Sequence, residues 1–373
     1  MYKPLLTFLA AASIAIAALT GCSKKAEIVP GAVWTDTEGQ QINAHGGGVL
    51  YHDGLYYWYG ENRPQKGFTS EAGVNVYSSP DLTTWTPLGL ALTVSDEPGS
   101  DIESGCIIER PKVIYNPKTG KFVMWFHLEL KGQGYGPARA AVAVADRPEG
   151  PFTFVKSGRV NPGIYPENMP EEVRNSGVTI ENLEWWTPRW YEAVDSGAIA
   201  LRDIEGGQMA RDQTVFVDDD GKAYHIYSSE DNLTLNVAEL NDEYTGHTGK
   251  YVRIFPAGHN EAPAIFKHNG KYWMIASGCT GWAPNEARLM TAENIYGPWE
   301  QLPNPCVGPD AELTFKGQSN YILPVEGQPG KFIAMFDRWN PENLFDSRYV
   351  WLPIDFKEDG TPYVEWRDSW ILD

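Results

Sequence analysis

Five ionisable or amide side chains each precede an apolar segment that is typical of a β-strand. They are His45, Glu109, Asp212, Glu261 and Gln318. In each copy the apolar segment leads through a turn into an aromatic-rich segment, most clearly after Asp212, with its turn at Gly221, and after Glu261, with its turn at Gly270. When such repeats stand radially, the residues at the head of each innermost strand converge on one axis. Carboxylates gathered at the mouth of such a funnel form a candidate site for acid–base catalysis.

The repeats predict an all-β fold, a five-bladed β-propeller. Period-two alternation of apolar and polar residues between turn residues supports strands throughout. We expect the N-terminal segment 28–34 and the C-terminal segment 366–373 to meet and close the ring. The blades are expected at about residues 45–92, 107–156, 211–255, 259–302 and 318–366.

Residues 158–207 form an insertion that does not share the repeat. Three Trp lie within residues 184–190, and a short helix is predicted from Arg189 to Ser196. Long insertions in compact domains are usually functional or disordered, and the Trp content argues against disorder. We expect this insertion to lie at the funnel rim and to shape substrate access.

The N-terminus indicates export. Lys3 is followed by an apolar run, Leu5 to Leu19, that is too short for a confident membrane span. The run ends in Leu-Thr-Gly-Cys22, which resembles the lipobox of bacterial lipoproteins. We therefore expect a lipoprotein signal peptide over 1–21, lipid on Cys22, a tether over 22–30 and the propeller over 31–373. The protein would then be an exported bacterial lipoprotein of the periplasm or cell surface that meets the membrane through its lipid anchor only; an ordinary cleaved signal is the alternative.

The composition of the chain limits the class of ligand that it can bind. The chain carries 49 acidic against 30 basic residues, a net charge of -19, so it has no basic stripe to neutralise the phosphates of nucleic acid. It also holds 14 Trp and 19 Tyr. Most of these aromatic rings are expected in the core, but the remainder suit the apolar faces of sugars. A polysaccharide or oligosaccharide is therefore the expected partner.

The cysteines leave two alternatives open. Cys106 is alone, whereas Cys279 and Cys306 could pair in an oxidising compartment or remain two buried thiols. No Cys or His spacing is typical of a metal finger. Gly46-Gly47-Gly48 lacks the Lys-Ser/Thr of a phosphate-binding loop.

The segments that begin at Asp212 and Glu261 resemble the two most recognisable signatures of glycoside hydrolase family 43. Members of that family are five-bladed propellers that hydrolyse glycosidic bonds with inversion. The resemblance implies that Glu261 is the general acid and that Asp212 orients it and raises its pKa. The physical chemistry agrees, because a neighbouring carboxylate raises the pKa of an acid that must stay protonated near neutral pH.

The chain departs from the family pattern at the first repeat. The family's general base is an Asp ahead of the first strand, and here His45 is followed by three Gly. This variation resembles the branch of exo-acting galactan 1,3-β-galactosidases, in which an amide acts as base through its imidic tautomer with a Glu nearby. Gln318 and Glu109 match those positions. Glu109 is the more ordinary base chemically, so both alternatives stay open, and His45 is expected to hydrogen-bond at the pocket floor.

Residues that follow the inner hairpins are candidate sugar contacts, because the loops after these hairpins project into the mouth. Rim residues that face solvent or pack between blades are the alternative. Together with His45, the candidates are Glu61, Glu230, Trp282, Arg338 and Trp339.

The leading hypothesis is an exo-acting, inverting glycoside hydrolase that releases terminal sugars from galactan or arabinogalactan side chains. The sugar that the hypothesis favours is β-1,3-linked galactose. A β-D-galactofuranosidase or an α-L-arabinofuranosidase of the same family is the alternative within the class. A non-catalytic sugar-binding propeller lipoprotein is the alternative of another class. No cofactor is expected; some family members hold Ca²⁺ on the propeller axis, and the sequence shows no dedicated ligand cluster for it.

Overall fold

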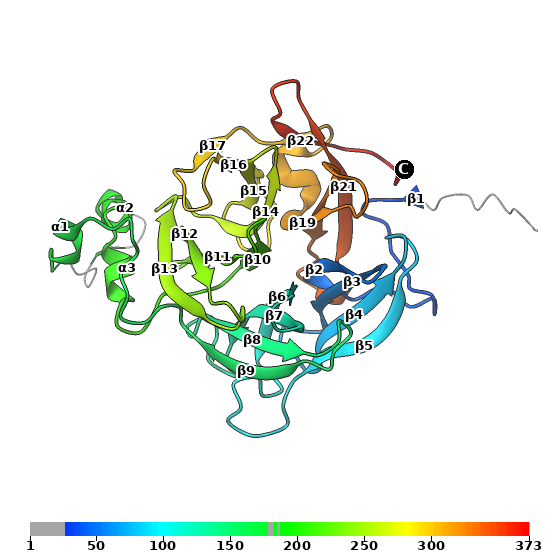
Figure 1. The fold of residues 1–373 in the computed structure, drawn as a ribbon, viewed down its shortest axis with the longest axis horizontal. Coiled ribbons are helices and arrows are strands. Elements are labelled where there is room, and N and C mark those ends of the chain that lie inside the picture. Colours follow the sequence, from blue (N-terminus) through cyan, green and yellow to red (C-terminus); the bar gives the residue numbers. More distant parts are fainter. Residues whose placement is uncertain (1–26, 178–182, 185–186, 373) are drawn as a thin grey trace, which may run out of the picture.

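Five β-sheets stand around a common axis in the computed structural model, which describes residues 27–177, 183–184 and 187–372 (Figure 1). The five-bladed β-propeller predicted from the repeats is confirmed. Within the described part of the chain, no helix is both long and apolar enough to cross a membrane. The predicted signal peptide, the lipidation of Cys22 and the first residues of the tether lie outside the described residues and stay predictions.

Each of the first four blades is an antiparallel sheet whose strands follow one another from the axis outward. The first blade comprises β2 (His45–His52), β3 (Leu55–Glu61), β4 (Gly73–Ser79) and β5 (Thr86–Thr93). The second comprises β6 (Ile107–Asn116), β7 (Lys121–Glu129), β8 (Arg139–Ala145) and β9 (Thr153–Gly158). The third comprises β10 (Gln213–Val217), β11 (Ala223–Ser229), β12 (Thr234–Leu240) and β13 (His247–Ile254). The fourth comprises β14 (Glu261–His268), β15 (Lys271–Ser277), β16 (Arg288–Ala292) and β17 (Glu300–Leu302).

The fifth blade carries an extra strand and the closure of the ring. Its order is β19-β20-β21-β22-β18, and β18 pairs in parallel with β22. The strands are β18 (Cys306–Val307), β19 (Gln318–Pro324), β20 (Phe332–Arg338), β21 (Arg348–Phe356) and β22 (Pro362–Glu365). Beside this blade, β1 (Glu27–Ile28) pairs with β23 (Trp370–Ile371) and so joins the two ends of the described chain.

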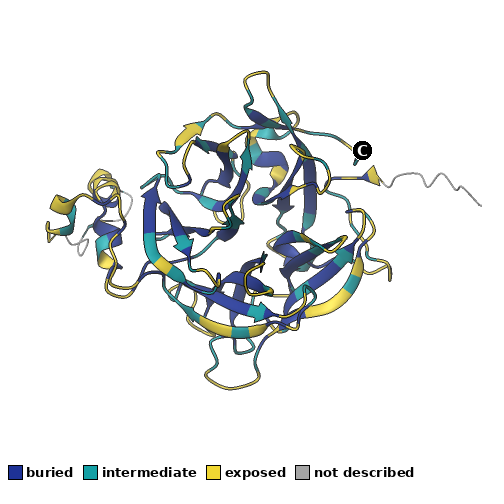
Figure 2. Ribbon diagram, in the orientation of Figure 1, coloured by how far each residue is buried: buried dark blue, intermediate teal, exposed yellow. Residues whose placement is uncertain are grey.

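Aromatic rings fill the space between the first and fifth blades. The ring of Trp58 lies 4.7 Å from that of Trp351 and 5.1 Å from that of Trp85, and all three side chains are buried. Inner strands are buried while stretches of the outermost strands β5 and β9 face solvent (Figure 2). Much of the high Trp content therefore serves packing between blades.

Three of the innermost strands share an irregularity beside a predicted head residue. The pairing register shifts directly after His45 in β2, after Glu109 in β6 and after Glu261 in β14. The next residue adopts left-handed backbone, with φ of 65° at Gly46, 55° at Arg110 and 53° at Ala262. A bulge of this kind re-aims a side chain, and left-handed backbone in a residue other than Gly costs free energy that surrounding contacts must offset. The repeated bulge thus turns the strand heads toward the axis.

The insertion folds beside the third blade. Its helices are α1 (Glu171–Arg174), α2 (Pro188–Asp195) and α3 (Ala198–Arg202). The Thr187 hydroxyl caps α2 by accepting a hydrogen bond from the Trp190 N–H, and Pro188 takes the first helical position. In Figure 1 the three helices lie outside the ring, beyond β13.

The insertion was expected at the funnel rim, where it would shape substrate access, and its described helices α2 and α3 pack against the third blade. Trp190, Val194 and Ile199 bury their side chains against Leu233 in the turn between β11 and β12. Since this apolar contact fixes α2 and α3 to the third blade, none of their residues lines the central pocket.

Cys106, Cys279 and Cys306 are all free thiols, so the pairing of Cys279 with Cys306 is not formed. Cys306 is buried and Cys279 is partly exposed.

Candidate active site

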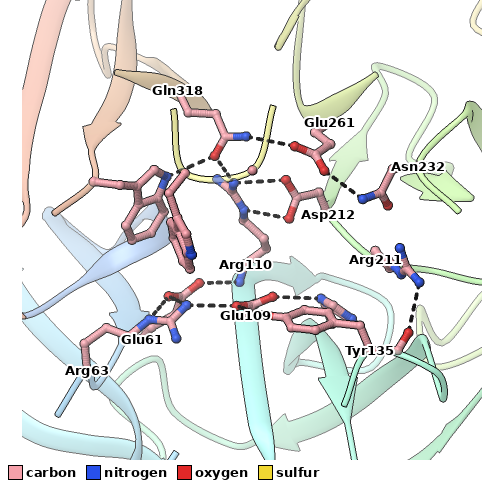
Figure 3. Close-up of a pocket in the computed structure, with 14 residues that line it drawn as sticks. Glu61, Arg63, Glu109, Arg110, Tyr135, Arg211, Asp212, Asn232, Glu261 and Gln318 are labelled. Atoms are coloured by element: carbon pink, nitrogen blue, oxygen red, sulfur yellow. Dashed lines mark hydrogen bonds and ion pairs between the residues drawn. The ribbon is translucent and has the colours of Figure 1, made fainter. Parts of the chain in front are cut away.

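One pocket of about 260 Å³ opens where the strand heads converge. Of the five predicted head residues, Glu109, Asp212, Glu261 and Gln318 line it (Figure 3). The full lining comprises Glu61, Arg63, Glu109, Arg110, His127, Tyr135, Arg211, Asp212, Asn232, Glu261, Gly281, Trp282, Gln318 and Trp339.

Arg110 occupies the centre of this arrangement. Its Nε and Nη2 donate to the two carboxylate oxygens of Asp212 at 3.0 and 2.9 Å, which is a bidentate ion pair. Nη2 also donates to Gln318 Oε1 at 2.6 Å. One guanidinium from the second blade therefore binds head residues of the third and fifth blades.

The amide of Gln318 has a defined orientation. Its oxygen accepts from Arg110 and from Trp339 Nε1, the latter at 2.9 Å. Both groups are donors only, so the amide oxygen must face them. Nε2 then faces Ser277 Oγ at 3.0 Å and Glu261 Oε2 at 3.4 Å.

Glu261 has the environment of a general acid. Burial, followed by the nearby charge of Asp212, raises the pKa of Glu261 to about 7. The Ala262 N–H donates to Asp212 Oδ2 at 3.1 Å and ties this carboxylate to the start of β14. At and below neutral pH the Glu261 carboxyl can therefore carry the proton that a leaving oxygen needs.

Glu109 has the opposite environment. Its Oε1 accepts from Arg63 Nη2 at 3.1 Å and from the Tyr135 hydroxyl at 3.0 Å, and Oε2 lies 3.2 Å from His127 Nδ1. Burial opposes its ionisation, but His127 and Arg63 outweigh burial and hold the pKa of Glu109 well below its usual range. Although burial disfavours the charged imidazole, contacts with Glu109 and Glu129 raise the pKa of His127 to about 9. Glu109 is thus a fixed negative charge with little tendency to take a proton from water.

Glu61 lines the pocket, but protein donors occupy its carboxylate. It is 2% exposed, Arg63 Nε donates to Oε2 at 2.5 Å, and the Arg110 N–H donates to Oε1 at 2.8 Å. Burial raises the pKa of Glu61, against the effect of Arg63. Its carboxylate holds Arg63 and the backbone of Arg110 in place.

His45 does not line the pocket. Its side chain is fully buried, with Nδ1 at 3.0 Å from Asp337 Oδ1 and the ring stacked on Tyr349 at 4.3 Å. Gly46 and Gly47 after it leave no room for a side chain. A Cβ at Gly46 would lie 2.0 Å from Glu61 Oε1, and a Cβ at Gly47 would lie 1.7 Å from Tyr59 O. The His-Gly-Gly-Gly segment therefore lets β2 pass close to β3 and to the Glu61 carboxylate.

The structure places two of the predicted sugar contacts away from the pocket. Glu230 is fully buried, and Arg253 binds both of its carboxylate oxygens at 2.6 and 2.8 Å. Arg338 donates twice to Phe315 O and lies over the ring of Trp366. Both side chains follow inner hairpins as predicted, but their partners turn them toward neighbouring segments instead of the pocket.

Trp282 and Trp339 do line the pocket. Their rings meet edge to face at 5.6 Å, and the side chain of Trp282 is 41% exposed. The guanidiniums of Arg63 and Arg110 lie over the ring of Trp339, 5.9 and 5.6 Å from its centroid. Trp339 is therefore fixed, while Trp282 presents an open aromatic face.

Several lining residues were not among the predicted site residues. Arg110 directly follows the predicted head residue Glu109. Its position in the sequence was a usable signal, because a cation there would lie among the acidic and amide head residues that converge on the axis. The other members come from second strands and loops, which the repeat does not mark. They are Arg63, His127, Tyr135, Arg211, Asn232 and Gly281.

No group of three or more His, Cys, Asp or Glu side chains that could hold a metal ion occurs among the residues described. A buried cation, Lys112, crosses between the inner strands, and its Nζ donates to Gly46 O at 2.7 Å and to Asn320 Oδ1 at 3.2 Å. Burial, together with the charge of Arg110, lowers the pKa of Lys112 to about 7.

Comparison with known proteins identifies the family. The model of glycosyl hydrolases family 43 matches residues 189–362. A solved GH43 β-1,3-galactosidase, in complex with galactodeoxynojirimycin, is 64% identical, with 92% of this chain and 100% of that chain covered and a TM-score of 0.91. The chain belongs to glycosyl hydrolase family 43. It is a glycoside hydrolase, as predicted from the segments at Asp212 and Glu261.

Two more distant relatives bear on the substrate. The exo-β-1,3-galactanase of Phanerochaete chrysosporium, solved with galactose, is 33% identical over 93% of this chain and 69% of that chain, with a TM-score of 0.74. A β-D-galactofuranosidase of Aspergillus niger is 24% identical over 300 residues, 79% of this chain and 74% of the relative.

The charge of Asp212 predicts a shift in the pH dependence of this family 43 enzyme. The pKa of Glu261 is raised, so the acid is protonated below about pH 7 and activity falls as pH rises through that value. Asp212→Asn removes the like charge and lowers the pKa of Glu261, so the alkaline limb of kcat/KM moves to lower pH. Profiles of wild type and variant between pH 4 and 9 measure this shift. An alkaline limb that stays in place or moves upward would contradict the assignment of Glu261 as the acid tuned by Asp212.

Proposed function

We propose that this protein is an exo-acting, inverting galactosidase that removes terminal β-1,3-linked galactose from galactan or arabinogalactan side chains. The observation that carries the proposal is a protonatable Glu261, beside the ion-paired Asp212, in a chain 64% identical to a β-1,3-galactosidase. The galactanase relative solved with galactose supports the same sugar.

The shape of the pocket supports exo action. A cavity of about 260 Å³ is small among ligand sites and suits one terminal sugar better than a length of polysaccharide. The open face of Trp282 can stack on the apolar face of a sugar, and the charged side chains below it can bind hydroxyls.

In this proposal Glu261 gives its proton to the oxygen of the leaving group. Asp212, held by Arg110, keeps that proton available near neutral pH. Water attacks the anomeric carbon from the opposite face, which inverts its configuration. The charge that develops on the sugar ring is positive, and the carboxylates of Asp212 and Glu109 stand in the same pocket.

We assign activation of water to Gln318. The carboxylate of Glu109 accepts from Arg63 and Tyr135 and forms an ion pair with His127, and its pKa is held low, so it is a poor base. Gln318 Nε2 lies 3.4 Å from Glu261 Oε2, closer than the roughly 6.5–9.5 Å that an inverting pair needs. The bound sugar must therefore separate the two side chains before water is activated.

The alternatives have less support. The galactofuranosidase relative is 24% identical, against 64% for the β-1,3-galactosidase, and nothing in the pocket favours an arabinofuranoside. A non-catalytic sugar-binding protein is not supported, because the relatives are hydrolases and an acid with a raised pKa has no use in binding alone.

Product release from a substrate panel tests the function. We expect wild type to release galactose from β-1,3-galactobiose and longer β-1,3-galactan one unit at a time. Glu261→Gln, which cannot protonate the leaving oxygen, should lose about 10²–10⁴-fold in kcat. Arabinofuranosides and galactofuranosides serve as matched comparisons. Release of a furanose sugar, or full activity of Glu261→Gln, would sink the proposal.

Azide rescue tests which residue activates water. A small anion needs no deprotonation, so azide should restore turnover to a variant that lacks only the base. We expect Gln318→Ala to regain about tenfold or more in turnover of an activated aryl galactoside and to form a glycosyl azide. Glu109→Ala serves as the comparison and should not be rescued. Rescue of Glu109→Ala alone would assign the base to Glu109.

A further inference from the structure

Two side chains from outside the predicted site hold one particular oxygen of Glu261. Asn232 Nδ2 donates to Oε1 at 2.7 Å, and Cys279 Sγ donates to the same oxygen at 3.2 Å. The other oxygen, Oε2, is approached by Gln318 Nε2 at 3.4 Å, at the long limit for a hydrogen bond. In Figure 3 Asn232 approaches the carboxyl from the side opposite to Gln318. The two oxygens of the acid are therefore chemically distinct.

We propose that Asn232 and Cys279 are positioning residues that place the proton of Glu261 on Oε2. The proposal rests on Glu261 being the general acid. When the carboxyl group is protonated, the oxygen that accepts the two hydrogen bonds is its carbonyl oxygen, which leaves the hydroxyl on the other oxygen. Oε2 is then the oxygen that can give its proton to the substrate, because Gln318 Nε2, its one hydrogen-bonding neighbour among the described residues, approaches only to 3.4 Å and moves away when the bound sugar separates the two side chains.

The turn that carries Asn232 is strained. Glu230, Asp231 and Asn232 have φ of 52°, 59° and 68°, three consecutive left-handed residues of which none is Gly. Left-handed backbone in residues other than Gly costs free energy, and clusters of this kind persist at functional sites when their surroundings fix them. The backbone of this turn is thus held in a conformation that its own residues disfavour.

Contacts around the turn account for its persistence. Arg253 binds both oxygens of the buried Glu230, and Arg202 Nη1 lies 2.9 Å from Asp231 Oδ2. Leu233 is fully buried against the insertion helices α2 and α3. Burial of Glu230 and packing of the insertion, which have no role in the pocket itself, therefore hold Asn232 against the acid.

Cys279 is fixed by an independent set of contacts. Asn285 accepts from the Gly278 N–H at 2.7 Å and donates to Gly278 O at 3.2 Å, which holds the segment after β15. Burial, with the charge of Glu261, raises the pKa of Cys279 to about 12, so the sulfur keeps its proton and remains a donor.

The sign of a pH effect follows from the groups that face Glu261. They are Asp212 ahead of β10, Arg110 in β6, Arg211, and the Cys279 thiol. A donor to a carboxylate oxygen favours the charged form, so loss of a donor raises the pKa of the acid. The alkaline limb of the activity profile then moves to higher pH, opposite to the shift expected for Asp212→Asn.

The test compares two substrates with different leaving groups, β-1,3-galactobiose and 2,4-dinitrophenyl β-galactoside. Asn232→Gly removes the donor and relieves the left-handed strain, so the variant folds. We expect kcat on galactobiose to fall roughly tenfold, short of the 10²–10⁴-fold contribution of a general acid, with KM nearly unchanged. The leaving group of the dinitrophenyl substrate needs no protonation, so the variant should cleave this substrate at nearly the wild-type rate.

The second variant pair tests the thiol. Cys279→Ala should move the alkaline limb of the activity profile to higher pH, and Cys279→Ser, which keeps a donor, should return the limb to its wild-type position.

Matched controls separate this role from a general effect of the substitutions. Asn269→Gly, at an exposed left-handed position with φ of 51° in the turn before β15, and Cys306→Ala, at a buried thiol, should leave both substrates and the pH profile unchanged. An equal loss on both substrates, or no shift of the alkaline limb, would overturn the proposal. If wild type cleaves neither galactoside while releasing another sugar from the panel, the proposed substrate fails, and the same comparison is made on that sugar.

Discussion

The contact between the Arg110 guanidinium and the Asp212 carboxylate is the interaction on which the site depends. It fixes a negative charge next to Glu261, and the same guanidinium determines the orientation of the Gln318 amide. Arg110 reaches these partners because the bulge in β6 gives it left-handed backbone, with φ of 55°, and because Glu61 accepts its backbone N–H. Strain in one strand is therefore offset by contacts with three other blades.

A second buried network of ion pairs keeps Glu61 and Glu109 next to positive groups. Arg63 bridges Glu61 and Glu109, and His127 lies between Glu109 and Glu129. Positive and negative groups alternate, so each buried charge has an opposite neighbour. Buried pairs of this kind contribute little net stability. Their effect here is to give two carboxylates different environments. Glu261 forms no ion pair with a cation among the described residues and has a raised pKa, whereas Glu109 has a lowered one.

The propeller and most strand heads were predictable because the sequence repeat marks where the innermost strand of each blade begins. Four of the five predicted heads line the pocket, and His45 does not, because its ring is buried between Asp337 and Tyr349. The role of Arg110 depends on a bulge that no local sequence pattern marks. The partners of Glu230 and Arg338, and the packing of helices α2 and α3 on the third blade, are contacts between distant segments, which periodicity does not encode.

The central claim is that Glu261 is protonated near neutrality while it stands beside an ion-paired carboxylate. Isotope-edited infrared titration of the carboxyl groups, with Glu261→Gln as the reference that removes one of them, tests it most directly. The account predicts a single carboxyl band that is lost near pH 7 in wild type and is absent from the Glu261→Gln spectrum. A Glu261 carboxyl that titrates near the ordinary value of about 4.3 would contradict it.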